Sequence, residues 1–325
     1  MLSAQLPLLL VSAALAGQPP SPPGQPRSGP GGSACAHKKV VSNAYGTGVE
    51  QYWLFEPAEP TPKSAPLVVF NHGWMGMVPA VYLGWIEHIV RRGSIVVFPR
   101  YQTGATTPPW TFTHNAIASV KLALEELKRP GHVAPDLARF AIVGHSAGGA
   151  IAADMAALAA AEGLPRPKAI MVVQPGRGVL AADNAFFPAA DYGKIPKDVL
   201  MLVVVGADDR LVGSLMAKDL FVRTPQIPAD HKDYIIVQSD RHGELPLVAD
   251  HISPCAPLQP PLIFPGRHID ALDYYAYWKL FDGLTDYAFF GTHKEFALGN
   301  TPEQRYMGKW SDGTAVKELV VTDNP

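Results

Sequence analysis

The chain has 325 residues, of which 47% are hydrophobic and 17% are charged, and its formal net charge is −2. This length and composition indicate a globular protein, most simply one large domain, and exclude a disordered chain. Because positive charge is not in surplus, we expect no nucleic-acid partner.

The first 33 residues predict a leader and a linker. Residues 1–16 contain an apolar run that ends in Ala14-Leu15-Ala16, a pattern that suits signal-peptidase cleavage after Ala16. No Lys or Arg precedes the run, which leaves an alternative start or an uncleaved segment open, and the run is too short to span a bilayer. Residues 17–33 are rich in Pro and Gly and predict a flexible lead-in. We therefore expect a secreted protein, extracellular or periplasmic, without stable membrane insertion.

From residue 34 onward, short β-branched runs alternate with longer amphipathic stretches. Strands are predicted at 67–70, 94–98, 140–143, 169–173, 200–205 and 234–237, and helices at 82–92, 115–128, 150–162, 215–221 and 269–290. Residues 40–56 can supply an antiparallel edge pair. The alternation predicts an α/β fold with a mostly parallel central sheet and helices on both faces. The short insert between 173 and 200 predicts no large cap, and we expect a single domain over 34–325 with a C-terminal extension after about residue 252.

A sharp turn between a predicted strand and a predicted helix carries the motif Gly144-His145-Ser146-Ala147-Gly148-Gly149. In such an elbow the small residues let the backbone bend and expose the serine Oγ. The following helix directs free N–H groups toward charge that develops beside the serine. Ser146 is therefore the candidate nucleophile, and a tight turn with a capping serine is the structural alternative.

An acid and a base for this serine follow at two later strand ends. Asp208 and Asp209 come after the 200–205 strand, and Asp209 is the preferred acid, with Asp208 as the alternative. His242 comes just past the 234–237 strand and is the predicted general base, with His251 as its competitor. The histidines show no zinc-protease spacing, so no metal is expected.

The chain contains only two cysteines, Cys35 and Cys255. In an oxidising compartment an even count favours a disulfide, so we expect a bridge between them. Two unrelated buried thiols are the alternative.

With its motifs in the order Ser, Asp, His, the chain resembles the α/β-hydrolase superfamily from about residue 40 to about residue 290. The Gly-His-Ser-Ala-Gly-Gly motif and the expected lack of a large cap are similar to secreted lipases and to cutinase-like, dienelactone-hydrolase-like and chlorophyllase-type esterases. The long segment after His242 and the two distant cysteines depart from the compact cutinase-like pattern. The oligomeric state is not predicted.

The resemblance implies hydrolysis of a small-molecule or lipid-like carboxylic ester through an acyl-enzyme, with no metal or organic cofactor. His242 would take the proton of Ser146 and later activate water. The turn Asn71-His72-Gly73-Trp74-Met75-Gly76 would form half of an oxyanion hole, with the N–H groups of Trp74 and Ala147 as donors. A serine peptidase or amidase and a non-catalytic binding protein of the same fold remain the alternatives.

Overall fold

The computed structural model describes residues 19–178, 187–259 and 267–325, so the predicted signal peptide lies outside the described residues. Within them, strands form one sheet in the order β1-β2-β4-β3-β5-β6-β7-β8-β9. The strands are β1 (Lys39–Tyr45), β2 (Tyr52–Ala58), β3 (Ser64–Asn71), β4 (Ile95–Pro99), β5 (Ala134–His145), β6 (Ala169–Val173), β7 (Leu200–Gly206), β8 (Lys232–Val237) and β9 (Val320–Thr322). The helices are α1 (Leu83–Arg91), α2 (Phe112–Glu126), α3 (Ala147–Glu162), α4 (Leu215–Val222), α5 (Lys279–Phe290) and α6 (Pro302–Arg305).

The sheet is parallel in its centre and antiparallel at both edges. Strands β4, β3, β5, β6, β7 and β8 run parallel. Strands β1 and β2 form the antiparallel pair expected over residues 40–56, and β9 pairs antiparallel with β8 at the opposite edge. The central strands are nearly continuous apolar runs because both of their faces are covered.

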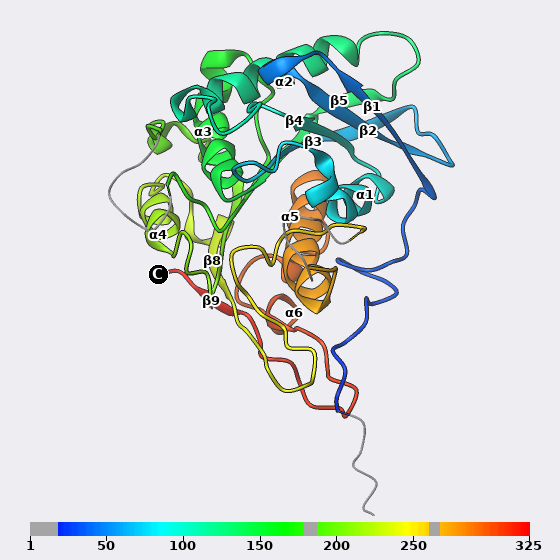
Figure 1. The fold of residues 1–325 in the computed structure, drawn as a ribbon, viewed down its shortest axis with the longest axis vertical. Helices are drawn as coiled ribbons and strands as arrows, with labels where there is room; N and C mark the ends of the chain where they lie inside the picture. The colour runs from blue at the N-terminus through cyan, green and yellow to red at the C-terminus, as the bar shows by residue number, and fades with distance from the viewer. Residues whose placement is uncertain (1–18, 179–186, 260–266) are drawn as a thin grey trace, which may run out of the picture.

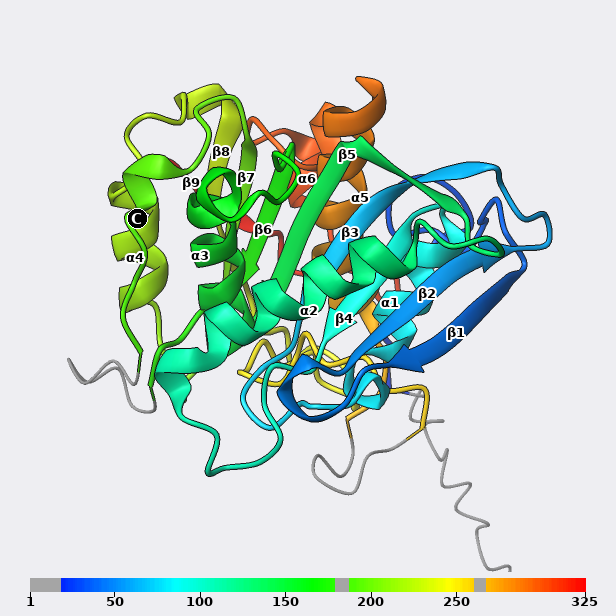
Figure 2. The same ribbon diagram turned by 90° about the horizontal axis from the view of Figure 1, so that it is seen from above.

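Helices cover the two faces of the sheet in separate layers (Figures 1 and 2). Helices α1 and α5 pack on one face, where Trp85 and Phe281 join the same buried cluster as Phe70 of β3. Helices α2, α3 and α4 cover the other face, where Ile117 and Ile151 share a second cluster with the alternate strand residues. This arrangement confirms the predicted α/β fold with a mostly parallel, doubly covered sheet.

Irregular elements join these layers. Between β6 and β7 the described residues contain only the short 3-10 helix Tyr192–Lys194. A π-helical segment, Asp273–Trp278, leads directly into α5, so the long aromatic helix predicted over 269–290 changes its hydrogen-bond pattern partway along.

Residues 19–33 lack regular structure, yet they have defined partners. The Ser21 N–H donates to Ser311 Oγ at 3.0 Å, and the Ser311 N–H donates to the Ser21 carbonyl at 3.0 Å. Gly31 N–H donates to Asp282 Oδ2 of α5 at 2.7 Å. Figure 1 shows this blue segment running beside the red C-terminal loops. The lead-in, predicted to be flexible from its composition, thus contacts the C-terminal extension through Ser21 and Gly31.

Both cysteines are free thiols, so the expected disulfide between Cys35 and Cys255 is not formed. Cys255 is buried, while Cys35 is partly exposed. Within the described residues, none of the helices has the length and apolar character needed to cross a membrane.

Candidate active site

The nucleophile elbow lies where β5 passes into α3. The parallel register pairs Gly144 with Asn71 of β3, and His145 with Val173 of β6, so three strand ends meet around Ser146. Ser146 has φ 57° and ψ −124°, a conformation that non-glycine residues rarely adopt and that costs about 1–3 kcal/mol. Its carbonyl accepts hydrogen bonds from Gly149 N–H at 2.9 Å and Ala150 N–H at 3.2 Å, which start α3 and hold the turn.

Two glycines of the motif make this turn sterically feasible. A Cβ at Gly144 would overlap the backbone of Gly148, and a Cβ at Gly148 would overlap the carbonyl oxygens of Asn71 and His72. The close approach of β3 to the first turn of α3 therefore requires glycine at both positions. Ser146 itself is buried, with its Oγ directed toward a histidine.

A line of hydrogen bonds joins Ser146, His251 and Asp209. His251 Nε2 lies 2.9 Å from Ser146 Oγ, and His251 Nδ1 lies 2.8 Å from Asp209 Oδ2. Because a carboxylate can only accept, Nδ1 carries the proton and Nε2 is left to accept the Ser146 hydroxyl proton. The arrangement has the polarity needed to activate a serine hydroxyl.

The turn after β7 orients the acid. Asp209 Oδ1 accepts the N–H groups of Leu211 at 3.0 Å and Val212 at 3.1 Å, which leaves Oδ2 for His251. Burial by itself would raise the pKa of Asp209, but the hydrogen bond and charge of His251, together with the two N–H groups, lower it below its usual value. Asp209 is therefore held as a carboxylate.

Asp208, the alternative acid, faces away from this line. Its Oδ2 accepts the Ser239 hydroxyl at 2.6 Å and Arg241 at 3.1 Å.

His242, the predicted base, is not the histidine that contacts Ser146. Its Nε2 lies 2.7 Å from Asp312 Oδ2 in an exposed pair, and its ring packs edge-on against Trp310. After the end of β8 the chain leaves the sheet and folds back on itself through an antiparallel bridge between Asp240 and Leu247. The segment then returns toward the strand ends before it reaches His251, so the prediction of His242 at the serine is wrong and the competitor His251 occupies that place.

The sequence offers one signal for this return. The short apolar run Leu247-Val248-Ala249 precedes His251, and both Leu247 and Ala249 are buried. Such a run indicates a chain that re-enters the core.

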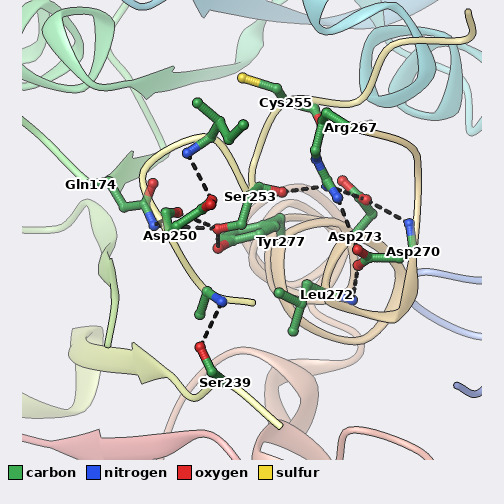
Figure 3. Close-up of polar contacts among 12 residues, drawn as sticks. Gln174, Ser239, Asp250, Ser253, Cys255, Arg267, Asp270, Leu272, Asp273 and Tyr277 are labelled. Carbon is green, nitrogen blue, oxygen red and sulfur yellow. Dashed lines mark hydrogen bonds and ion pairs between the residues drawn. The ribbon is translucent and has the colours of Figure 1, made fainter. Parts of the chain in front are cut away.

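Several side chains hold the loop that carries His251, as Figure 3 shows. Gln174 Nε2, at the end of β6, donates to the Asp250 carbonyl at 2.9 Å, and Ser239 Oγ accepts the Ala249 N–H at 2.9 Å. Ser253 Oγ donates to the same Asp250 carbonyl at 2.6 Å and contacts Tyr277 Oη at 2.6 Å. Sequence reasoning missed these supporting residues, because nothing in their local pattern marks them.

A buried arginine ties the end of this loop to the π-helical segment (Figure 3). Arg267 donates to the carbonyls of Ser253 at 2.5 Å and Cys255 at 2.7 Å, and pairs with Asp273 at 2.6 Å and Asp270 at 2.9 Å. The loop is thus connected to both the sheet and the α5 side of the molecule.

The predicted oxyanion turn lies against the elbow. A Cβ on Gly73 would lie 3.2 Å from Ser146 Cβ, which shows how closely this turn approaches the nucleophile. The N–H groups on either side of Trp74 are directed elsewhere, because Gly73 donates to Tyr82 Oη at 2.9 Å and Met75 donates to Gln102 Oε1 at 2.9 Å. Ala147, the other predicted donor, is the first residue of α3.

Comparison with known proteins agrees with this architecture. Residues 68–204 match a family model described by the alpha/beta hydrolase fold. The fold and this match show an α/β-hydrolase-fold protein, which confirms the predicted superfamily resemblance and supports a hydrolase.

Among solved structures, carboxyl esterase 2 from the mycorrhizal fungus Tuber melanosporum is similar at 17% identity and a TM-score of 0.46. The similarity covers 66% of this chain and 80% of that chain. A search of the curated proteins found no match.

Proposed function

We propose that this protein is a serine hydrolase that cleaves carboxylic esters through an acyl-enzyme on Ser146. The observation that carries the proposal is the continuous hydrogen-bond line from Ser146 Oγ through His251 to Asp209. His251 is the general base in this proposal, in place of His242. The family match to the alpha/beta hydrolase fold supports the reaction class.

In the first half of the reaction, His251 Nε2 accepts the Ser146 hydroxyl proton while Oγ attacks the ester carbonyl carbon. The negative charge moves onto the carbonyl oxygen, where the N–H groups of Trp74 and Ala147 are the proposed donors. The C–O bond to the alcohol then breaks, and the protonated His251 transfers its proton to the departing alkoxide. This leaves an alcohol product and an acyl ester on Ser146.

In the second half, His251 accepts a proton from water as the water oxygen attacks the acyl carbon. Collapse of this intermediate returns the proton to Ser146 Oγ and releases the carboxylic acid. Asp209 keeps Nδ1 protonated in both halves and stabilises the imidazolium that forms twice per turnover. Protonation of His251 before the first step would remove the proton acceptor, so we expect the rate to fall on acidification.

Apolar side chains near the strand ends support an ester with hydrophobic groups. Met75 lies in the oxyanion turn, Val78 follows it, Leu211 follows Asp209, and each is more than 40% exposed despite its size. Exposed apolar side chains next to a polar reaction centre suit a small-molecule or lipid-like ester.

Hydrolysis of p-nitrophenyl esters from acetate to palmitate tests the proposal. Ser146→Ala should lower kcat by about 10⁴–10⁶-fold while circular dichroism stays unchanged. A matched p-nitroanilide series separates an esterase from an amidase. An inactive wild type, or a Ser146→Ala variant as fast as the wild type, would remove the catalytic role of the elbow.

We further propose that the protein is secreted, supported by the apolar run and the Ala14-Leu15-Ala16 pattern of residues 1–16. Sequencing the N-terminus of the exported protein tests this, with Gly17 as the expected first residue.

A further inference from the structure

Two buried side chains, Tyr82 and His145, connect the oxyanion turn to the loop of His251. Gly73 N–H donates to Tyr82 Oη at 2.9 Å, and Tyr82 Oη lies 2.8 Å from His145 Nδ1. His145 Nε2 lies 2.8 Å from the backbone carbonyl oxygen of His251. Tyr82 is 2% exposed and His145 is 3% exposed, so water cannot substitute for any of these partners. The four residues come from the turn after β3, the start of α1, the elbow and the histidine loop.

The protonation state of each group fixes which atom donates and which accepts in this series of hydrogen bonds. Burial, with the nearby charge of His251, lowers the pKa of His145 to about 3, so its imidazole is neutral and carries a single N–H. Nε2 faces a carbonyl oxygen, which can only accept, and therefore carries that hydrogen. Nδ1 must then accept, and Tyr82 must donate to it.

Tyr82 remains able to donate because burial raises the pKa of its phenol well above the usual value. Its oxygen accepts the Gly73 N–H while its hydrogen is directed to His145. The direction therefore runs from Gly73 N–H through Tyr82 and His145 to the His251 carbonyl. Reversing any one hydrogen bond would leave a buried donor facing a donor, or an acceptor facing an acceptor.

Both ends of this chain adjoin groups that the proposed reaction uses. Gly73 precedes Trp74, the proposed oxyanion donor, and the carbonyl at the other end belongs to the proposed base, His251. Gln174 holds the neighbouring carbonyl of Asp250 at 2.9 Å, so two consecutive carbonyls of the histidine loop are fixed by side chains from adjacent strand ends. A shift of the oxyanion turn would thus displace the loop of the base, and a shift of that loop would displace the oxyanion turn.

Resting on the proposed function, we propose that Tyr82 and His145 are positioning residues that hold the oxyanion turn and the general base in register through a one-directional hydrogen-bond relay. Neither side chain exchanges a proton with substrate in this role. Their contribution is to keep the base and the oxyanion donor at a fixed separation during both halves of the reaction.

Three variants test the relay by kinetics. Tyr82→Phe removes the tyrosine hydroxyl, and His145→Leu removes both ring nitrogens of the histidine. His145→Gln keeps a donor for the His251 carbonyl and an acceptor for Tyr82 in a side chain that does not titrate. We expect Tyr82→Phe and His145→Leu to lower kcat about 10–100-fold with KM within about twofold of the wild type. His145→Gln should restore most of the rate.

The double variant separates a relay from two independent packing effects. Once His145→Leu has broken the relay, adding Tyr82→Phe should cost little more, so the two losses in kcat should not multiply. Multiplying losses, or a rise in KM equal to the fall in kcat, would overturn the proposal. Tyr52→Phe is the matched control, because it deletes a tyrosine hydroxyl that donates to the Leu122 carbonyl at 3.3 Å on α2, away from the site.

Nuclear magnetic resonance of the histidine nitrogens tests whether the relay exists, independently of enzyme activity. In protein labelled with ¹⁵N in its histidines, His145 should show a protonated Nε2 and an unprotonated Nδ1 from about pH 8 down to about pH 4. The Nδ1 resonance should shift in Tyr82→Phe. A doubly protonated His145 at neutral pH, or the opposite tautomer, would contradict the relay.

A result that rejects the proposed esterase function differs from a result that rejects the relay. In that case the wild type turns over no ester, or Ser146→Ala matches it, while the His145 spectrum still shows whether the relay exists.

Discussion

The serine and the acid of the candidate site sit at the ends of sheet strands, whereas the histidine sits in a loop without helix or strand of its own. Ser146 follows β5 directly and Asp209 follows β7 by one short turn, so the backbone ladder of the sheet places both. His251 lies in the 249–256 stretch and depends on side-chain hydrogen bonds from Gln174, His145 and Arg267. The hydrogen-bond ladder of the sheet is thus enough to position Ser146 and Asp209, whereas His251 needs additional side-chain hydrogen bonds.

Replacing each of the two histidines by alanine should give the strongest contrast in activity. His251→Ala removes the only imidazole bonded to Ser146 among the described residues, so kcat for p-nitrophenyl esters should fall about 10⁴–10⁶-fold. His242→Ala removes a half-exposed pair with Asp312 and should change kcat by less than about threefold. Loss of activity in His242→Ala with retention in His251→Ala would reverse the assignment.

The two neighbouring aspartates give the next largest contrast. Asp209→Asn keeps the shape of the side chain but can present an NH₂ group to His251 Nδ1, which favours the wrong tautomer and should lower kcat about 10³–10⁴-fold. Asp208→Asn keeps an oxygen that can accept the Ser239 hydroxyl and does not contact His251, so it should lower kcat far less than Asp209→Asn. Steady-state kinetics of the two variants, side by side, settles which carboxylate supports the base.

Breaking the scaffold of the loop should cost stability as well as rate. Arg267→Met leaves the buried Asp273 without its cation and releases the Ser253 and Cys255 carbonyls, so the free energy of unfolding should fall by about 3–5 kcal/mol. We also expect a lower kcat at temperatures where the variant is still folded, because the His251 loop loses an anchor. Urea unfolding with parallel kinetics measures both.

The control for this variant is Arg223→Met, which removes an exposed arginine paired with Asp219 and should cost less than about 1 kcal/mol. Equal losses of stability in the two variants would show that the buried anchor has no special role.

The smallest predicted effect concerns His88, which pairs with Asp282 between α1 and α5 and has no direct contact with Ser146, His251 or Asp209. Burial alone would lower the pKa of His88, but the Asp282 carboxylate 2.7 Å away and the Cys35 thiol raise it to about 9. Because the folded pKa lies above the unfolded value of about 6.5, the stabilisation is complete below about pH 6.5 and is lost as pH rises through about 9. It amounts to about 3 kcal/mol at most.

His88→Gln should therefore be less stable than the wild type at pH 6, and the gap in unfolding free energy should close by pH 10. Chemical unfolding of both proteins across this range measures the gap. A gap that is constant with pH would mean that His88 is neutral in the folded protein. Activity at constant pH should be unaffected as long as the variant is folded, because His88 and Asp282 pack between α1 and α5.

Sequence patterns predicted the strand-borne part of this molecule because strand position, apolar periodicity and the elbow motif are local. The glycines around Ser146 and the acidic turn after β7 both lie within a few residues of a strand end. The structure brings Ser146 and Asp209 to one place, although the choice of histidine failed. His242 satisfies the local rule of a histidine just past a strand, but the Asp240–Leu247 bridge reverses the chain there and carries His251 to the serine instead.

Long-range contacts account for the other differences. The linker composition of residues 19–33 gave no hint that Ser311 and Asp282 would supply its hydrogen bonds. The pairing of Cys35 with Cys255 followed from their number alone, and the structure gives them separate neighbours, with Cys35 near His88 and Cys255 near Tyr82. Neither relation can be derived from residues adjacent in sequence.

The pairing of Ser21 with Ser311 has a consequence for how the chain is made. The N-terminal segment leaves the ribosome long before its partners in the C-terminal extension, and most of the sheet can assemble during that interval. Closing a loop of that length is entropically costly, so these contacts form late in folding, after the strands of the central sheet have paired. The segments around Ser21 and Ser311 are therefore ordered together, so a change that loosens one of them should loosen the other.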